Sequence, residues 1–305
     1  MRLIIDCSHL CYRSLYTGGE LTHQEKQVGV IFGFLRQILK LADQFKTNQL
    51  IFCWDSKQSY RKMICPEYKA NRRNDLTPEE AEDLKIAYSQ FDILRDKVLP
   101  YMGFSNIFYQ NGYEADDLIA LICYRLPDDT MIISSDNDLF QLLRQDRFCP
   151  VRMWNFKAIN DEAHFSQAWH GLKPIDWVKV KAIAGCDGDN VKGIYGIGPD
   201  SAAKYVAGIL KGKKLEQIER WKKESKEKWD INFALVTLPF AGLRPINIKW
   251  INSDNISVEK FEAIFGQYGF RSLLGEGSAK WKEAFFGGNK DGGKSGTPPV
   301  RKIQR

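Results

Sequence analysis

The chain has 305 residues, of which 44% are hydrophobic and 27% charged, and it carries a net charge of +6. This is the composition of a globular protein with room for one large domain or two smaller ones. No apolar run approaches the ~20 residues of a membrane span, and the sequence reaches Asp6 too soon for a secretory signal. We therefore expect an intracellular protein without a membrane partner.

The seven cysteines are irregularly spaced and include no CxxC pair. This spacing argues against a zinc knuckle or a disulfide framework. Cys7, Cys53 and Cys123 stand in apolar runs, so we expect them to be small core residues.

Strand-like and helix-like segments alternate along the first half of the chain. Short apolar runs predict four strands, at residues 3–5, 50–54, 107–108 and 131–133. Helical periodicity or helix-forming composition predicts helices at residues 28–45, 78–98 and 116–125, with another starting at 139–143. This alternation predicts an α/β fold with a mainly parallel sheet and flanking helices.

The second half reads as helical. A helix at 177–184, an acidic glycine-containing loop and a helix from Pro199 or Asp200 together predict a helix–hairpin–helix-type element. Residues 211–228 are rich in Lys and Glu and predict a solvated helix. Residues 287–305 have a net charge of +4 and few apolar side chains, so we expect a flexible basic tail.

Acidic residues recur at the ends of the predicted strands. Asp6, Asp55 and Asp136 stand at or just past such ends, while Glu114 and Asp116 precede a helix. Open α/β sheets bind ligands beyond the carboxyl ends of their strands. We therefore expect these acids to meet at one edge of the sheet.

Converging carboxylates repel one another unless a proton or a cation compensates them. Divalent cations such as Mg²⁺ and Mn²⁺ prefer oxygen ligands, and two ions about 4 Å apart can assist hydrolysis of a phosphodiester. When nine candidate acidic ligands are set aside, the chain has 44 basic and 29 acidic residues, a net charge of +15 that suits a nucleic-acid backbone. The nine candidate ligands are Asp6, Asp55, Glu114, Asp116, Asp117, Asp136, Asp138, Asp187 and Asp189.

Each acidic motif alone has a plainer interpretation. An Asp after a strand is commonly a cap or a turn residue, and the runs YEADD and SSDND are also typical of helix N-termini. The run GCDGDN is equally typical of a turn. The ordered combination of these motifs is much more specific than any one of them.

A basic segment follows Asp55. Cations that neutralise phosphates and rings that stack on unpaired bases suit a single strand, although an exposed basic loop without a role would look similar. The candidate residues are Lys57, Tyr60, Arg61, Lys62, Tyr68, Lys69, Arg72 and Arg73.

Three glycines, Gly193, Gly196 and Gly198, lead into a predicted helix. Glycines permit close backbone approach and helix N-termini bind phosphate, although a simple tight turn is the alternative. Lys181 and Lys204 flank this turn and are candidate phosphate contacts. Because none of these groups reads base edges, we expect recognition of DNA shape.

The motifs LIIDCSHL, FCWDSKQSYRKMICPEYKANRR, YEADDLIA, ISSDNDL and GCDGDNVKGIYGIGPDSAAK occur in the order and spacing of a known family. In these motifs the chain resembles the structure-specific 5′-nucleases, which include flap endonucleases, the 5′→3′ exonuclease domains of bacterial DNA polymerase I, and phage exonucleases and RNase H-like primer-removal enzymes. The resemblance covers residues 1 to about 210. It looks most like a stand-alone bacterial or phage enzyme, which implies the cytoplasm of a bacterial or phage-infected cell.

The resemblance implies a domain organisation. It gives a PIN-like nuclease core over 1–174 with a basic arch at about 57–90, and a helix–three-turn–helix DNA-binding region over 175–245. Residues 246–286 would complete the fold, and 287–305 would form the tail.

The resemblance also implies site roles. Asp6, Asp55, Glu114, Asp116 and Asp136 resemble ligands of a first metal ion, directly or through water. Asp117, Asp138 and Asp189 resemble the second site or its water shell. Arg61 and Lys69 resemble cations that contact the scissile phosphate, and Tyr68 and Arg72 match the same motif. The implied ions are two Mg²⁺ or Mn²⁺, with K⁺ at the glycine turn.

One motif departs from the family pattern. Polymerase-type and phage members usually carry Asp directly after the glycine, where this chain has Cys186; another branch has Gly-Ser/Cys-Asp, which Gly185–Asp187 matches. Asp187 and Asp189 therefore remain alternative second-site ligands. Because a thiol is a poor Mg²⁺ ligand, we expect a structural role for Cys186.

The main hypothesis is a metal-dependent 5′-nuclease that hydrolyses phosphodiesters at 5′ flaps, nicks or primer ends in replication or repair, leaving 5′-phosphates. Its expected partners are DNA with 5′ junctions and RNA–DNA primer hybrids, with a replication protein a further candidate through the tail, and we expect a monomer. The alternatives are a non-catalytic DNA-junction binder, a Toprim-type nuclease and a small PIN ribonuclease.

Overall fold

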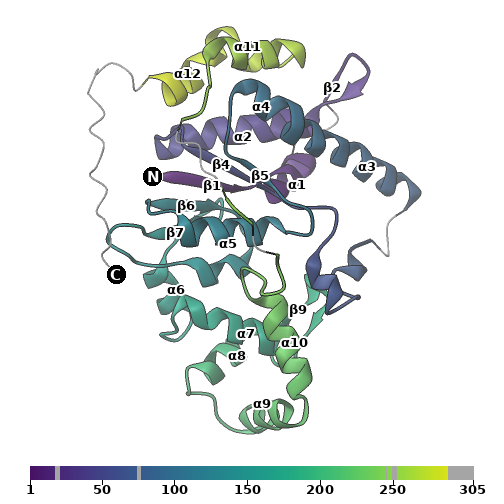
Figure 1. The fold of residues 1–305 in the computed structure, drawn as a ribbon, viewed down its shortest axis with the longest axis vertical. Helices are drawn as coiled ribbons and strands as arrows, with labels where there is room; N and C mark the ends of the chain where they lie inside the picture. The colour runs from purple at the N-terminus through teal and green to yellow at the C-terminus, as the bar shows by residue number, and fades with distance from the viewer. Residues whose placement is uncertain (18–20, 74–76, 245, 249–252, 288–305) are drawn as a thin grey trace.

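The computed structural model describes residues 1–17, 21–73, 77–244, 246–248 and 253–287, without the side chains of Thr17, Arg72 and Arg73. A central sheet lies between two layers of helices, and a further group of helices extends beyond one face (Figure 1). The tail predicted for 287–305 lies outside the described residues from 288 onward.

The sheet has the strand order β5-β4-β1-β6-β7-β8. Neighbouring strands from β5 to β7 run parallel, and only β8 is antiparallel to its neighbour. β1 is central, and its residues 3–5 form a buried apolar run that ends at Asp6, as expected of a parallel strand covered on both faces. The strands are β1 (Arg2–Asp6), β4 (Leu50–Trp54), β5 (Ile107–Tyr109), β6 (Thr130–Ile133), β7 (Val151–Trp154) and β8 (Ile159–Asn160).

The predicted α/β class and the four predicted strands are confirmed. β7 and β8 were not predicted, because β7 alternates buried and half-buried residues and β8 has only two residues. The chain leaves β1 toward β4 and β5 and then returns to β6 on the other side of β1. The strand order therefore reverses beside the carboxyl end of β1, which is the switch point where open α/β sheets bind ligands.

One helical layer combines the N-terminal and C-terminal parts of the chain. Leu3 and Ile5 of the sheet pack against Phe34 and against Phe261 from the C-terminal region, within one buried cluster. The side-chain amide of Asn48 also donates to the carbonyl of Phe285. This layer contains α1 (Cys7–Thr17), α2 (Gly29–Phe45), α3 (Pro78–Ile93), α4 (Leu99–Met102), α11 (Val258–Gln267) and α12 (Ala279–Phe286).

The opposite face of the sheet is covered by α5 and by a helical group that follows β8. Ile4, Ile51 and Ile132 point into this second core. Asn232 ties the group together, because its amide donates to the carbonyls of Ala182 and Lys192. The helices are α5 (Ala115–Arg125), α6 (Glu162–Ala168), α7 (Trp177–Ala184), α8 (Pro199–Val206), α9 (Lys213–Glu224) and α10 (Lys226–Val236).

Several local elements differ from the sequence predictions. The helix expected over 211–228 is two helices, α9 and α10, which meet at Ser225. Residues 139–143 lie mainly in a 3₁₀ helix, Asn137–Leu142, instead of starting an α-helix. Two short hairpins were too brief to predict from periodicity: β2 (Thr22–His23) with β3 (Lys26–Gln27), and β9 (Gly185–Cys186) with β10 (Val191–Lys192). Within the part of the chain that the structure describes, no helix is long and apolar enough to cross a membrane.

Gly193 and Gly198 differ in their surroundings. A Cβ on Gly193 would lie 2.1 Å from the carbonyl carbon and oxygen of Ala184. A Cβ on Gly198 would meet nothing within 4 Å. Gly193 therefore permits the close packing of the β9–β10 hairpin on α7, whereas Gly198 leaves open space before α8.

We predict that Gly193→Ala lowers the free energy of unfolding by at least ~2 kcal/mol, because backbone must move to admit the methyl group. Gly198→Ala is the matched control and should stay within about 1 kcal/mol of the wild type. Urea denaturation measures both. Equal stabilities for the two variants would contradict the packing role given to Gly193.

Candidate active site

Four acids gather at the carboxyl edge of the sheet, at the switch point. Asp6 is the last residue of β1, Asp55 directly follows β4, and Asp136 follows β6. Asp55 Oδ1 accepts a hydrogen bond of 2.7 Å from the amide of Ala115, at the start of α5. That contact brings Asp116, in the first turn of α5, to the same edge.

Hydrogen bonds fix the orientation of Asp6. One carboxylate oxygen accepts from the amide of His9 at 3.0 Å, and the other accepts from the hydroxyl of Ser134 at 2.9 Å. Ser134 Oγ also accepts from the amide of Asp136 at 3.1 Å. Ser134 therefore joins the two strand ends. Ser134 is not among the site residues predicted from the sequence, although it belongs to the SSDND run.

Two of these acids, Asp6 and Asp116, have raised pKa values. Burial, followed by the charges of Asp55 and Asp136, raises the pKa of Asp6 to about 7. Burial and the charges of Asp136, Asp6 and Asp55 raise the pKa of Asp116 well above its ordinary value. The sheet edge is thus a concentrated negative site that favours a proton or a cation.

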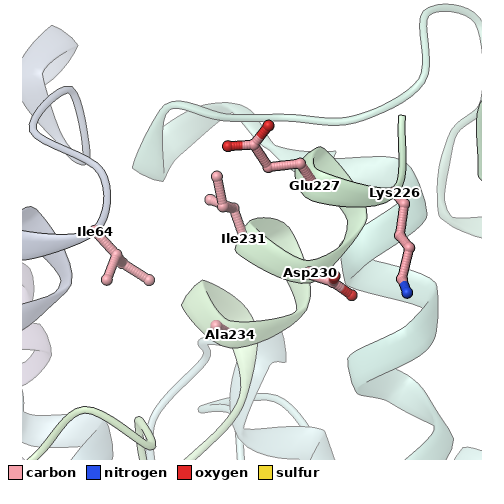
Figure 2. A pocket seen from close by; sticks show the side chains of 6 residues that line it. All are labelled: Ile64, Lys226, Glu227, Asp230, Ile231 and Ala234. Carbon is pink, nitrogen blue, oxygen red and sulfur yellow. The ribbon is translucent and has the colours of Figure 1, made fainter. Parts of the chain in front are cut away.

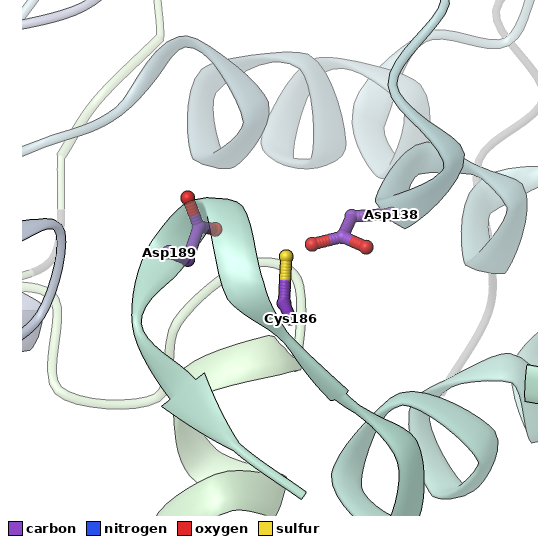
Figure 3. A group of neighbouring side chains, drawn as sticks. All are labelled: Asp138, Cys186 and Asp189. Carbon is purple, nitrogen blue, oxygen red and sulfur yellow. The ribbon is translucent and has the colours of Figure 1, made fainter. Parts of the chain in front are cut away.

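A second group forms where the 3₁₀ helix after β6 meets the β9–β10 hairpin. One ligand atom from each of Asp138, Cys186 and Asp189 lies within 4.8 Å of the others (Figure 3). The Lys181 ammonium lies 2.6 Å from Asp138 Oδ1. Burial, followed by the charge of Asp136, raises the pKa of Asp138 to about 6 despite this lysine.

Asp187 lies outside this group. Asp187 is exposed, and its backbone carbonyl accepts a hydrogen bond from the side-chain amide of Asn71. Between the two alternatives left open by the sequence, the geometry favours Asp189 over Asp187 as a member of the second group.

Two further candidate ligands, Glu114 and Asp117, are held by side chains of the basic segment. Arg61 forms a bidentate pair with Asp117 at 2.7 and 2.9 Å and lies 3.3 Å from Glu114 Oε2. Lys69 Nζ and the Tyr68 hydroxyl lie 2.9 and 3.0 Å from the same Glu114 oxygen. Burial alone would raise the pKa of Glu114, but Lys69 and Arg61 outweigh it and hold this pKa below its ordinary value.

This arrangement does not fit three of the predicted roles. Only 2% of Arg61 is exposed, and its Nε donates to the carbonyl of Leu235, so Arg61 is placed to support the site and not to contact a phosphate. Asp117 is fully buried and also accepts from the amides of Glu114 and Phe240, so it is not placed to bind a metal ion. Tyr68 is 3% exposed, which does not fit stacking on a base.

The basic segment is fixed against the β9–β10 hairpin. The amide of Lys69 donates to the carbonyl of Asp189 at 2.9 Å, and the side chain of Asn190 donates to the carbonyl of Glu67 at 2.8 Å. Lys69 Nζ also lies 3.9 Å from Asp189 Oδ1, so its charge stands between the two groups of acids. The segment therefore closes over the site from one side.

The other predicted nucleic-acid contacts are distributed around this core. Lys57 and Lys62 are exposed, and Lys57 Nζ lies 3.4 Å from Asp92. Tyr60 packs edge-on against Tyr113, with ring centroids 6.2 Å apart. Part of the Tyr60 ring is therefore in contact with the protein itself. The side chains of Arg72 and Arg73 lie outside the described residues.

At the glycine turn, Gly196 has a φ of +76°. Both Gly196 and Gly198 have open space around the position of a Cβ. Lys204 is bonded to Asp200 at 2.7 Å on α8. Lys181, predicted as a phosphate contact, is instead engaged with Asp138, and its side chain is 13% exposed. Of the two flanking lysines, Lys204 is the more accessible.

A separate open cavity of ≈ 570 Å³ lies between Ile64 of the basic segment and one side of α10 (Figure 2). Its lining combines apolar and charged side chains but includes none of the predicted site residues. The cavity residues are Ile64, Lys226, Glu227, Asp230, Ile231 and Ala234.

Comparisons with known proteins place the chain in a family. Residues 1–170 match the family described as 5′-3′ exonuclease, N-terminal resolvase-like domain. The chain belongs to this family. It is 27% identical over 215 residues to the 5′-3′ exonuclease of Bacillus subtilis, covering 67% of this chain and 69% of that protein.

The chain also resembles larger proteins and solved structures. It is 27% identical to the thermostable DNA polymerase I of Thermus thermophilus over 90% of its own length, but spans only 33% of that polymerase. The bacteriophage T5 D15 flap endonuclease, solved in a pseudo-enzyme-product complex with DNA and metal ions, shares the fold. The TM-score is 0.64 at 21% identity, with 92% of this chain and 97% of the phage chain covered.

We predict that the metal-free protein loses stability as pH rises. Asp6 keeps its proton in the folded state to about pH 7, whereas an unfolded Asp releases it near pH 4. The folded state thus binds more protons, so the free energy of unfolding falls between these values. Thermal unfolding at about pH 5.5 and about pH 8 should show a larger loss of Tm in the wild type than in Asp6→Asn. An equal loss in both would contradict the raised pKa.

We predict that Arg61→Met lowers the free energy of unfolding by about 3–5 kcal/mol, because it leaves Asp117 charged and buried without its partner. Lys62→Met, at the exposed neighbouring position, should change stability by less than about 0.5 kcal/mol. Chemical denaturation measures both. Wild-type stability in Arg61→Met together with lost phosphate binding would instead support the direct contact expected from the sequence.

Proposed function

We propose that this protein is a divalent-metal-dependent 5′-nuclease that hydrolyses phosphodiesters at 5′ flaps, nicks or primer ends and leaves 5′-phosphates. The observation that carries the proposal is the meeting of Asp6, Asp55, Asp116 and Asp136 at the switch point of the sheet, with raised pKa values for Asp6 and Asp116. A site built only to bind DNA gains nothing from anions that face phosphates.

The donor set fits divalent cations. Carboxylate oxygens in a shared negative field are the ligands that Mg²⁺ and Mn²⁺ prefer, and two separate groups of acids suit two ions. Asp6, Asp55, Asp116 and Asp136 would hold the first, while Asp138 and Asp189 would belong to the second. Bound metal would supply an activated water and stabilise the leaving oxygen.

The protein's own cations are proposed to place the substrate. Lys69 carries an ammonium group between the two groups of acids, where it can stabilise charge developing on a phosphoryl group. Lys57 and Lys62 are exposed on the same segment and would attract the single strand. The segment's position over the acids supports a free 5′ end as the part of the substrate that enters.

The duplex would lie against the glycine turn before α8. Open space at Gly196 and Gly198 permits close approach of a phosphate to backbone amides. We propose that K⁺ binds at this turn. Recognition there would follow duplex shape and junctions, because backbone amides do not read base sequence.

We also propose nucleic-acid and protein partners for this chain. DNA with 5′ junctions is the main substrate, and RNA–DNA primer hybrids are a second. We propose a monomer, and a replication protein as a partner of the tail at residues 287–305, which lies outside the described residues from 288 onward. The chain spans about a third of the length of the Thermus thermophilus DNA polymerase I that it matches.

We predict that Asp136→Asn lowers the cleavage rate of a 5′-flap substrate by roughly 10²–10³-fold, the usual effect of losing one electrostatic group at a reaction centre. Cleavage should depend on Asp136 because it belongs to the sheet-edge group and its charge also acts on Asp138 of the second group. Asp129→Asn is the matched control, because Asp129 precedes β6 at the opposite edge of the sheet and pairs with Arg152.

Single-turnover cleavage of a labelled 5′ flap, a nicked duplex and an RNA-primed duplex gives the measurement. DNA binding by Asp136→Asn should be retained, and chelation with EDTA should stop wild-type cleavage. Wild-type rates in Asp136→Asn or in EDTA would contradict the proposal. Tight junction binding by the wild type without cleavage in any divalent metal would favour the non-catalytic alternative.

A further inference from the structure

The hairpin brings a thiol as well as carboxylates to the second group of acids. One ligand atom each of Asp138, Cys186 and Asp189 lies within 4.8 Å of the other two. The Cys186 side chain points into the space between the two carboxylates (Figure 3). The three side chains come from two segments that are about fifty residues apart in sequence, so the fold and not a local turn assembles them.

Local backbone structure explains why the thiol, and not the neighbouring carboxylate, joins the group. Cys186 ends β9 and pairs with Val191 of β10. The chain then forms a tight turn that closes at Asn190 in the left-handed conformation. The turn leaves Asp187 exposed, while Cys186 and Asp189 are half-buried on the side that faces Asp138.

Asp138 offers a buried oxygen to this group. The residue is 8% exposed, and the Lys181 ammonium lies 2.6 Å from its Oδ1. Lys181 thus acts here as a point charge on a flexible stem. Such a charge can withdraw when another cation takes over the neutralisation.

We propose that Cys186 is a direct ligand of the second cation and that this site prefers thiophilic cations such as Zn²⁺, Co²⁺ and Cd²⁺ to Mg²⁺. Thiolate sulfur is a soft ligand that stabilises these ions, whereas Mg²⁺ selects oxygen. When the cation binds, the thiol proton passes to solvent and a metal–sulfur bond forms. The inference rests on the proposed function only in treating the hairpin group as a cation site.

The two groups of acids then differ in metal preference. The sheet edge has only carboxylate oxygens and suits Mg²⁺ or Mn²⁺, while the hairpin group has two carboxylates and a thiol. A low concentration of a thiophilic cation therefore occupies the hairpin group and leaves the sheet edge to Mg²⁺. The structural role expected for Cys186 from the sequence is replaced by a ligand role.

The test is a Cd²⁺ titration of the reduced full-length chain in excess Mg²⁺, followed by the ultraviolet thiolate-to-cadmium absorption band. The wild type should show a band that saturates at one Cd²⁺ per chain. Cys186→Ser should lose the band and bind Cd²⁺ more weakly by at least the ~10–100-fold typical of changes around a metal site. Cys149→Ser is the matched control, because Cys149 also lies beside a carboxylate, 3.4 Å from Asp146.

Cys186→Asp covers the case in which the serine variant fails to fold, and circular dichroism checks both. The aspartate variant should show no band, and Mg²⁺ should compete with Cd²⁺ in calorimetry. A band that persists in Cys186→Ser and Cys186→Asp, that disappears in Cys149→Ser, or that Mg²⁺ removes from the wild type overturns the inference. The band is read without DNA, so failure of cleavage and failure of this site are separate results.

Discussion

Repulsion among carboxylates at one edge of the sheet is the constraint on which the rest of the structure depends. Parallel strands end at the same edge, so Asp6, Asp55 and Asp136 approach one another although up to 130 positions separate them (Asp6 to Asp136). Such a site costs folding free energy unless positive charge compensates it. Burial, together with the charges of Asp55 and Asp136, raises the pKa of Asp6 to about 7, which is one expression of that cost.

The protein compensates only part of this charge by itself. Arg61 neutralises Asp117 and, with Lys69, neutralises Glu114, while Lys181 faces Asp138. The sheet-edge acids are not members of these ion pairs, and this division is the physical reason to assign them to metal ions. The ion pairs of Arg61 and Lys69 hold the basic segment against the start of α5, and hydrogen bonds to the hairpin hold it from the other side. The groups that stabilise the fold therefore also set the entrance to the site.

The sequence was sufficient for four strands of the sheet and for the position of the acids, because buried strands are continuous apolar runs and an acid at their end stands out. It was not sufficient for β7 and β8. It was not sufficient to separate ligands from supporting residues. Arg61 looks like an exposed cation in a basic loop, and only the fold shows that Asp117, 56 positions later, encloses it. Likewise, the side of the hairpin turn that faces Asp138 decides between Asp187 and Asp189. The packing of α11 and α12 on the first helical layer depends on contacts that no local pattern encodes.

The central claim is that cations bind at the strand ends and at the hairpin, and iron-directed oxidative cleavage tests it most directly. Fe²⁺ replaces Mg²⁺ in the protein, peroxide and ascorbate generate hydroxyl radicals at the bound ion, and mass spectrometry maps the cut backbone positions. The account predicts cuts near Asp6, Asp55 and Asp136 and near residues 186–189, all suppressed by excess Mn²⁺. Cuts confined to other surface acids, or cuts unaffected by Mn²⁺, would contradict it.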